Sequence, residues 1–258
     1  MEQNHYNQLD VFRGLAALSV CAVHFNYNSN FFHNYFAMGI FVQLFFSLSG
    51  FVIFLNYYQK INKLNDLVRF IKKRFKRLYP LHLFFLILFG LSECLKYFLS
   101  IKYGISGDDK PFVVNNVENF LLNLVFLQHF ADTVNFNLPA WSISVEIMLY
   151  ITFAFLVLYF NKYIIWISII YSIFFIYFLS QLYGASNSIN AYYSGLYSFF
   201  IGCLFCYLFI KKKLFINSFF YELFYLIIIA IFISEIFYYK LLVNNQYLYS
   251  IFFGLIFF

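Results

Sequence analysis

The chain has 258 residues, of which 63% are hydrophobic and only 11% are charged. A soluble domain carries about 25% charged residues, so the composition excludes an ordinary soluble protein and predicts a polytopic membrane protein. The formal net charge of +6 comes mostly from short basic runs between apolar stretches. Such runs indicate membrane orientation and contacts with phosphate groups, and they do not indicate nucleic-acid binding.

Membrane-spanning helices are expected wherever about 20 consecutive residues are mostly apolar. The stretches that fit, the last of them cut short by the chain end, are 11–29, 37–57, 80–100, 141–160, 163–183, 192–210, 219–239 and 247–258. The sequence therefore predicts an all-α, polytopic transmembrane helix bundle of about eight spans. We expect it to form one integral-membrane domain over residues 1–258.

Lysine and arginine between the spans predict the orientation of the bundle. The strongest cluster, Lys72–Arg77, lies between the second and third spans, so this loop and the N-terminus are expected on the cytoplasmic side. Lys162 and Lys211–Lys213 share that side only if the apolar stretch 120–130 does not cross. We therefore expect 120–130 to be re-entrant or to lie along the outer surface, which is tolerated at membrane depth when the backbone is buried in protein. The stretch 186–190 is expected to be an external turn.

The first span carries ionisable residues on one face. On a helix with 3.6 residues per turn, Asp10, Arg13 and His24 share a stripe, and Arg13 and His24 are about 16 Å apart along the axis. An ionisable residue within a span costs about 2.5–3.5 kcal/mol on insertion scales and therefore suggests a functional site. The alternative is that Arg13 extends to the cytoplasmic head groups and His24 is a hydrogen-bonded core histidine.

A second candidate site lies at the start of the span 141–160. Trp141 suits the membrane interface, and Glu146 sits about 7–8 Å inside the outer end of the span, at the depth expected for His24. Ser142 and Tyr150 flank Glu146 at i−4 and i+4. A carboxylate beside a histidine can orient the ring for general base catalysis. The alternative is that Glu146 pairs with another polar group to hold the bundle together.

A third candidate site is the basic run that ends in Arg74-Phe75-Lys76-Arg77-Leu78-Tyr79-Pro80. The positive-inside rule and anionic lipids explain much of its charge. Arginine also suits bidentate contacts with phosphate. With Arg13 near the same membrane face, Arg74 and Arg77 could hold the phosphates of a donor such as a coenzyme A thioester.

Two further features are interpreted as packing. Phe46–Phe51 places small residues in the middle of a span, which lets helices approach closely. Cys203 and Cys206 have CxxC spacing inside a span with no second ligand pair nearby, so we expect small helix residues and no metal site.

Four short motifs occur in order along the chain. They are Leu9-Asp10-x-x-Arg13-Gly14-Leu15-Ala16-Ala17 with His24, Phe46-Ser47-Leu48-Ser49-Gly50-Phe51, Arg74-x-x-Arg77-Leu78-Tyr79-Pro80, and Trp141-Ser142-Ile143-Ser144-Val145-Glu146. Together, in this order and at comparable spacing, they resemble the signature of acyltransferase family 3 membrane proteins.

The resemblance implies a bundle of about ten transmembrane helices that moves an acyl group, commonly acetyl, from cytoplasmic acyl-CoA to an extracytoplasmic carbohydrate. It implies acyl-CoA as donor substrate, no bound cofactor, and a place in the cytoplasmic membrane of a bacterium. His24 matches the family's essential histidine, and Glu146 matches the acidic residue of the tryptophan motif. Arg13, Arg74 and Arg77 match the arginines thought to handle the donor. The family's cores usually contain about two more spans, so we expect a C-terminally truncated member.

The sequence thus favours a membrane O-acyltransferase in which His24, oriented by Glu146, acts on a sugar hydroxyl. Asp10, Ser142, Trp141 and Tyr150 are expected to support this site. Two alternatives stay open. One is a transporter or flippase for a lipid-linked sugar, and the other is a truncated family member that works only with a partner. The acceptor, the acyl chain length and the oligomeric state are not set by these motifs.

Overall fold

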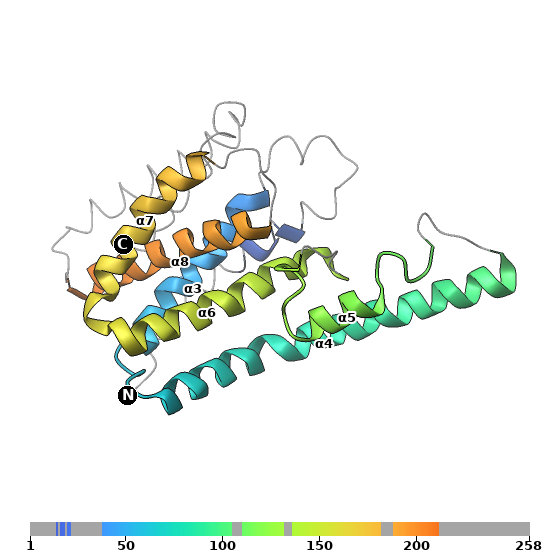
Figure 1. Cartoon of the computed structure of the whole chain (residues 1–258), viewed down its shortest axis with the longest axis horizontal. Helices are drawn as coiled ribbons and strands as arrows, with labels where there is room; N and C mark the ends of the chain where they lie inside the picture. The colour runs from blue at the N-terminus through green and yellow to red at the C-terminus, as the bar shows by residue number, and fades with distance from the viewer. Residues whose placement is uncertain are drawn as a thin grey trace. The chain divides into compact units, whose positions relative to one another are not determined.

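The computed structural model describes residues 38–104, 110–131, 136–181 and 188–211, together with 14, 16–18, 20 and 21. Within these residues the chain is helical and contains no strand (Figure 1). The expected spans 219–239 and 247–258, and most of 11–29, lie outside the described residues.

Six helices, α3 to α8, and two short 3-10 turns make up the described part. They are α3 (Met38–Tyr57), α4 (Leu64–Tyr103), α5 (Val117–Leu124), η1 (Leu138–Ala140), α6 (Trp141–Phe160), η2 (Asn161–Tyr163), α7 (Ile164–Gln181) and α8 (Ser188–Lys211). The helices expected at 37–57, 141–160, 163–183 and 192–210 are confirmed to within a few residues. The turn expected over 186–190 is wrong for its last three residues, because α8 begins at Ser188.

The chain divides into two compact units. The first contains residues 1–60, 162–183 and 193–258, and the second contains 61–161 and 184–192. Three described segments are long and apolar enough to cross a membrane: Leu64–Tyr103, Trp141–Ser172 and Ala191–Ile210. A shorter apolar helical segment covers Phe41–Tyr57.

In the second unit, α4 is a single helix of 40 residues, about 60 Å long. The loop expected over Lys72–Arg77 is therefore wrong, since the helix begins at Leu64 and continues through the basic run. The early start has a local cause: the Asp66 carboxylate accepts the Lys63 backbone N–H at 3.2 Å, which caps the first turn. Pro80 lies inside the helix at an exposed position and does not end it.

The segment 120–130, expected not to cross the membrane, forms no spanning helix. α5 contains only eight residues, about 12 Å, and turns follow it as far as Ala131. The Asn116 side chain caps α5 by accepting the Asn119 N–H at 2.8 Å. Figure 1 shows α5 lying along the second half of α4, and the two helices pack against each other.

Phe126, in the turn after α5, inserts its ring against α4. The side chain is 1% exposed. Its ring centroid lies 5.3 Å from that of Phe75, 5.8 Å from that of Tyr79 and 4.7 Å from that of His82. Its backbone carbonyl accepts a hydrogen bond from Ser144 on α6. Phe126 has φ +60°, a conformation that costs a residue with a Cβ about 1–2 kcal/mol, so the surrounding contacts must hold it in place.

Two more hydrogen bonds fix this turn, which we call the Phe126 wedge and define as residues 123–128. The buried His82 ring donates through Nε2 to the carbonyl of Asn123 at 2.8 Å. The buried Gln128 amide donates to the carbonyl of Ala140 at 3.1 Å, just before α6 begins. The wedge therefore connects α4 to α6 by side-chain contacts on both sides.

In the first unit, the backbones of α3 and α8 touch at two glycines. A Cβ added to Gly50 would lie 1.9 Å from the carbonyl oxygen of Phe199, and one added to Gly202 would lie 2.0 Å from that of Ser47. The Cys203 thiol donates to the Gly50 carbonyl at 3.5 Å. The small residues of Phe46–Phe51 thus serve close packing, as the sequence indicates.

Removing the ring of the Phe126 wedge should strongly destabilise the second unit. We expect Phe126→Ala to lower the free energy of unfolding by about 3–5 kcal/mol, because a fully buried aromatic ring leaves a cavity. Thermal unfolding of the detergent-solubilised protein measures this. Val125→Ala, at a neighbouring side chain that is 58% exposed, is the control and should unfold almost as the wild type does. Equal midpoints for the two variants would show that the wedge does not hold the unit together.

A methyl group at the contact between α3 and α8 should not be tolerated. We expect Gly202→Ala to lower the yield of folded, monodisperse protein several-fold, because the methyl would overlap a backbone carbonyl that cannot move alone. Size-exclusion chromatography in detergent checks it. Gly90→Ala on α4 is the matched control, since its Cβ would meet only the Phe120 ring at 3.6 Å, an ordinary contact. Normal folding of Gly202→Ala would contradict the close approach.

Candidate functional site

The predicted site residues fall into two groups. Asp10, Arg13 and His24 lie outside the described residues, so the pairing of His24 with Glu146 stays a prediction. The other predicted residues lie in the second unit, with two on α4 and four on α6. They are Arg74, Arg77, Trp141, Ser142, Glu146 and Tyr150.

Arg74 points from α4 toward α6. Its guanidinium carbon lies 5.6 Å from the centre of the Phe70 ring and 5.9 Å from the centre of the Tyr150 ring. Phe70 precedes Arg74 by one helical turn, so both lie on the α4 face that packs on α6. Contacts of this kind between a cation and aromatic rings contribute about 0.5–2 kcal/mol, more where water is excluded. Arg74 is half-buried.

Glu146, one turn before Tyr150 on α6, accepts a hydrogen bond from the Tyr150 hydroxyl. Tyr150 is 4% exposed, and its ring lies 6.1 Å from that of Phe70. One tyrosine thus contacts Arg74 with its ring and Glu146 with its hydroxyl. Hydrogen bonds to a carboxylate are among the stronger ones in proteins, so this contact restricts how Glu146 can rotate.

The level at which Arg74 meets α6 differs from the sequence-based expectation. Arg74 was expected near the cytoplasmic face and Glu146 in the outer layer. In the structure Arg74 lies beside Tyr150, at the middle of α6 and one turn from Glu146. The middle of the expected span 80–100 lies about 24 Å farther along α4. The basic first half of α4 therefore packs along α6, and the expected spans 80–100 and 141–160 are offset along their length.

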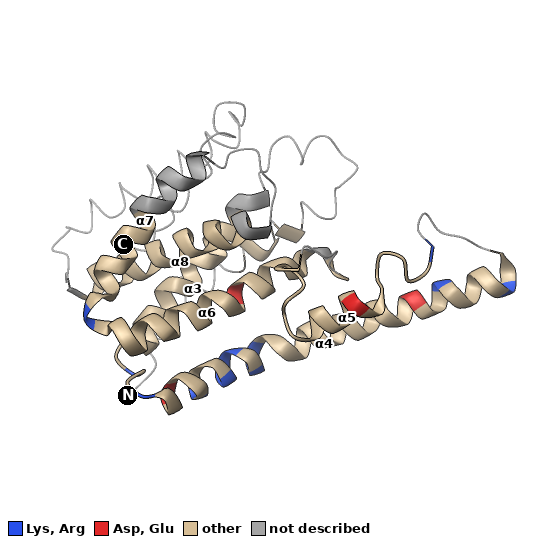
Figure 2. Ribbon diagram, viewed as in Figure 1, with Lys and Arg blue, Asp and Glu red and all other residues tan. Residues whose placement is uncertain are grey.

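Arg77 is exposed, unlike Arg74. The basic residues of α4 gather on its first half (Figure 2). They are Arg69, Lys72, Lys73, Arg74, Lys76 and Arg77, and all but Arg74 are exposed or at the edge of the packed face. This surface can attract an anion with several phosphate charges.

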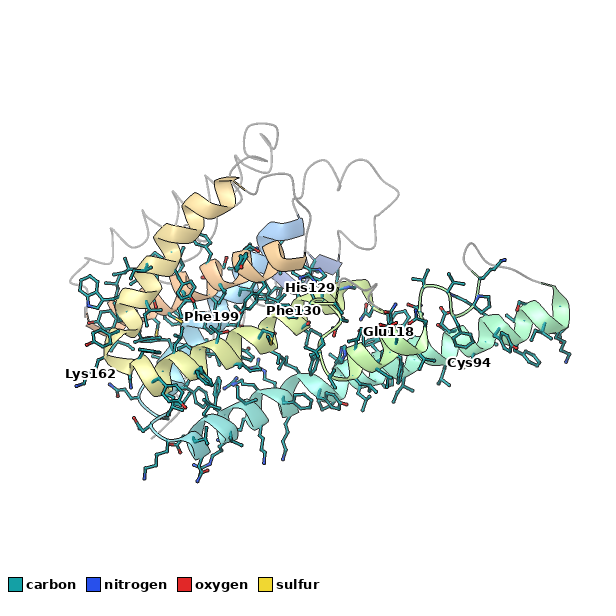
Figure 3. The ribbon with its side chains drawn as sticks, viewed as in Figure 1. Cys94, Glu118, His129, Phe130, Lys162 and Phe199 are labelled. Atoms are coloured by element: carbon teal, nitrogen blue, oxygen red, sulfur yellow. The ribbon has the colours of Figure 1, made fainter. Side chains whose placement is uncertain are left out.

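Ser142 and Trp141 make contacts at the start of α6. The Ser142 hydroxyl donates to the carbonyl of Pro139 at 3.0 Å, which steadies the first turn. The Trp141 ring lies 5.5 Å from the His129 ring, and Figure 3 shows His129 and Phe130 beside this end of α6. Of the two residues predicted to flank Glu146, Tyr150 donates a hydrogen bond to it in the structure. The Ser142 hydroxyl donates to the Pro139 carbonyl.

Glu93 is a further buried carboxylate on α4, at 3% exposure. It accepts Lys96 Nζ at 2.6 Å, Asn115 Nδ2 at 2.9 Å and the Phe112 N–H at 3.1 Å. These bonds fasten the turn after residue 110 to α4. Beside it lies a cavity of about 320 Å³ between α4 and α5, whose lining includes Gly90, Cys94 and Phe120 and is almost entirely apolar. Cys94 and Glu118 mark this end of the unit in Figure 3.

The motifs in the sequence do not point to His82, Glu93 or the Phe126 wedge. His82 and Glu93 could have been found, because each is an ionisable residue inside an expected apolar span. The sequence carries no such signal for the Phe126 wedge, because the positive φ of Phe126 and the contacts of its ring depend on residues far away in the sequence. Within the described ranges, no group of three His, Cys, Asp or Glu side chains could hold a metal ion.

Comparison with known proteins identifies the family. The family model described as an acyltransferase domain, that of acyltransferase family 3, matches residues 6–258. Among the curated proteins and among the solved structures, nothing matches the chain. The match covers nearly the whole chain, includes the four motifs, and agrees with the apolar helices. The chain therefore belongs to acyltransferase family 3, and it is a membrane acyltransferase.

Proposed function

We propose that this chain is a membrane O-acyltransferase that uses acyl-CoA, acetyl-CoA in the simplest case, as its donor. The acceptor is a hydroxyl of an extracytoplasmic or lipid-linked carbohydrate. The observation that carries the proposal is the contact of Tyr150 with both Arg74 and Glu146. It brings the basic motif of α4 next to the acidic residue of the tryptophan motif.

In the proposed reaction, His24 is the general base. Its imidazole takes the proton of the acceptor hydroxyl while that oxygen attacks the thioester carbonyl. The C–S bond breaks, an ester forms, and the departing thiolate takes up the proton. Glu146 orients the ring and stabilises the imidazolium formed on the way. An acyl-imidazole intermediate on His24 would use the same groups.

The donor's phosphates bind to arginines. Arg13, Arg74 and Arg77 are the residues that the family resemblance assigns to this task, and the cluster of basic residues on the first half of α4 supports it (Figure 2). In the proposed topology the N-terminus and this cluster face the cytoplasm, where acyl-CoA is found, in the cytoplasmic membrane of a bacterium. The whole chain acts as one membrane domain.

The first test is transfer or hydrolysis of radiolabelled acetyl-CoA by membranes that contain the chain. We expect turnover that falls by at least about 100-fold in His24→Ala, the order of magnitude that a general base contributes. Glu146→Gln should lose a smaller but clear part of the activity, since it removes the charge and keeps the shape.

Glu118→Gln is the matched control for Glu146→Gln, because Glu118 is exposed in the first turn of α5. It should retain wild-type turnover. Full activity in a folded His24→Ala protein would contradict the mechanism. Acetyl-CoA binding without turnover would favour a member that needs a partner, and neither binding nor turnover would favour transport of a lipid-linked sugar.

A further inference from the structure

We infer that the two arginines of the basic motif have different tasks: Arg77 contacts the donor's phosphates, and Arg74 positions Glu146 through Tyr150. This inference rests on the proposed function and divides a role that the family resemblance gives to both residues alike.

The two side chains differ first in where they point. Three residues on a helix place Arg77 about 60° around the axis from Arg74 and about 4.5 Å along it. That rotation is enough to take Arg77 off the face packed on α6. Arg74 is half-buried and lies over two rings, whereas Arg77 is exposed beside the exposed Lys76 and Lys73. A phosphate arriving from solvent therefore meets Arg77 first.

The position of Arg74 lets it act on Glu146 through the Tyr150 side chain. A guanidinium over the Tyr150 ring draws electron density from the ring, which makes the hydroxyl a better hydrogen-bond donor. That hydroxyl donates to Glu146. A stronger bond fixes the carboxylate in one orientation, which is what the proposed role of Glu146 in orienting the His24 ring requires.

The rings around Tyr150 keep this arrangement rigid. The Phe70 ring lies 6.1 Å from Tyr150 and 6.3 Å from Phe153, which is fully buried. Tyr150 therefore cannot turn away from Arg74 without opening a cavity. A lysine at position 74 would keep the charge that acts on the Tyr150 ring but lose the flat stacking surface of arginine, so it should restore only part of the effect.

The test compares four variants in acetyl-CoA binding and in turnover by the full-length protein in detergent. Arg77→Gln should weaken acetyl-CoA binding about tenfold and leave kcat nearly unchanged, as expected for one lost contact to a charged group. Arg74→Gln should change binding less than about twofold and lower kcat about tenfold. Arg74→Lys, which keeps the charge, should have a kcat between those of Arg74→Gln and the wild type. Tyr150→Phe should lower kcat to the same extent.

A double-mutant cycle separates positioning from general damage. If Arg74 acts through Tyr150, then Arg74→Gln combined with Tyr150→Phe should have the kcat of either single variant, because the second change removes an effect already lost. Tyr159→Phe, at an exposed tyrosine of the same helix, is the matched control and should keep full activity. Thermal unfolding of every variant shows which ones fold.

Each outcome is decisive. Equal loss of acetyl-CoA binding in Arg74→Gln and Arg77→Gln would overturn the division of tasks, and so would a multiplicative loss of kcat in the double variant. If the wild type binds acetyl-CoA but shows no turnover, the proposed function fails, while the binding comparison still judges the two arginines. If the wild type neither binds nor turns over acetyl-CoA, both fail together.

Discussion

The packing of α4 against α6 is the constraint on which the second unit depends. Two groups of contacts determine which residues of α4 lie opposite which residues of α6. Near the start of α6, the Phe126 wedge connects His82 on α4 with Ser144 on α6. Six residues farther along α6, Arg74 lies over Tyr150. A shift by one turn would break both groups at once, so the relative position of the basic motif and the tryptophan motif is well determined.

This packing also explains how a cation can lie beside an apolar helix. An arginine at the middle of α6 would be costly if it faced hydrocarbon alone. Arg74 instead lies over the Phe70 and Tyr150 rings, and the Glu146 carboxylate is one hydrogen bond farther on. Arg74 and Glu146 thus belong to one group of contacting side chains, and the Tyr150 side chain lies between them. The same group brings the basic motif of α4 and the acidic residue of the tryptophan motif within one helical turn of each other.

Much of the fold could be predicted from the sequence, because hydropathy alone determines where apolar helices lie. The limits of α6 agree with the expected span, and 120–130 was recognised as too short to cross. The start of α4 was missed because a run of lysine and arginine was interpreted as a loop, although Asp66 caps a helix there. The contact of Arg74 with the middle of α6 was not foreseen for a related reason: counting residues from span ends cannot show which turns of two long helices lie side by side.

The candidate site shows the same limit at the scale of one motif. Arg74-x-x-Arg77 is a pattern in the sequence, and a pattern cannot tell which arginine faces a neighbouring helix. Three residues of spacing turn the second side chain by about 60°, which separates a half-buried cation over Tyr150 from an exposed one. Tyr150 was singled out because it follows Glu146 by one turn, yet its contact with Arg74 joins two motifs that are 76 residues apart in the chain. The chemistry of a site is carried by such contacts, so two arginines of one motif can take different parts in one reaction.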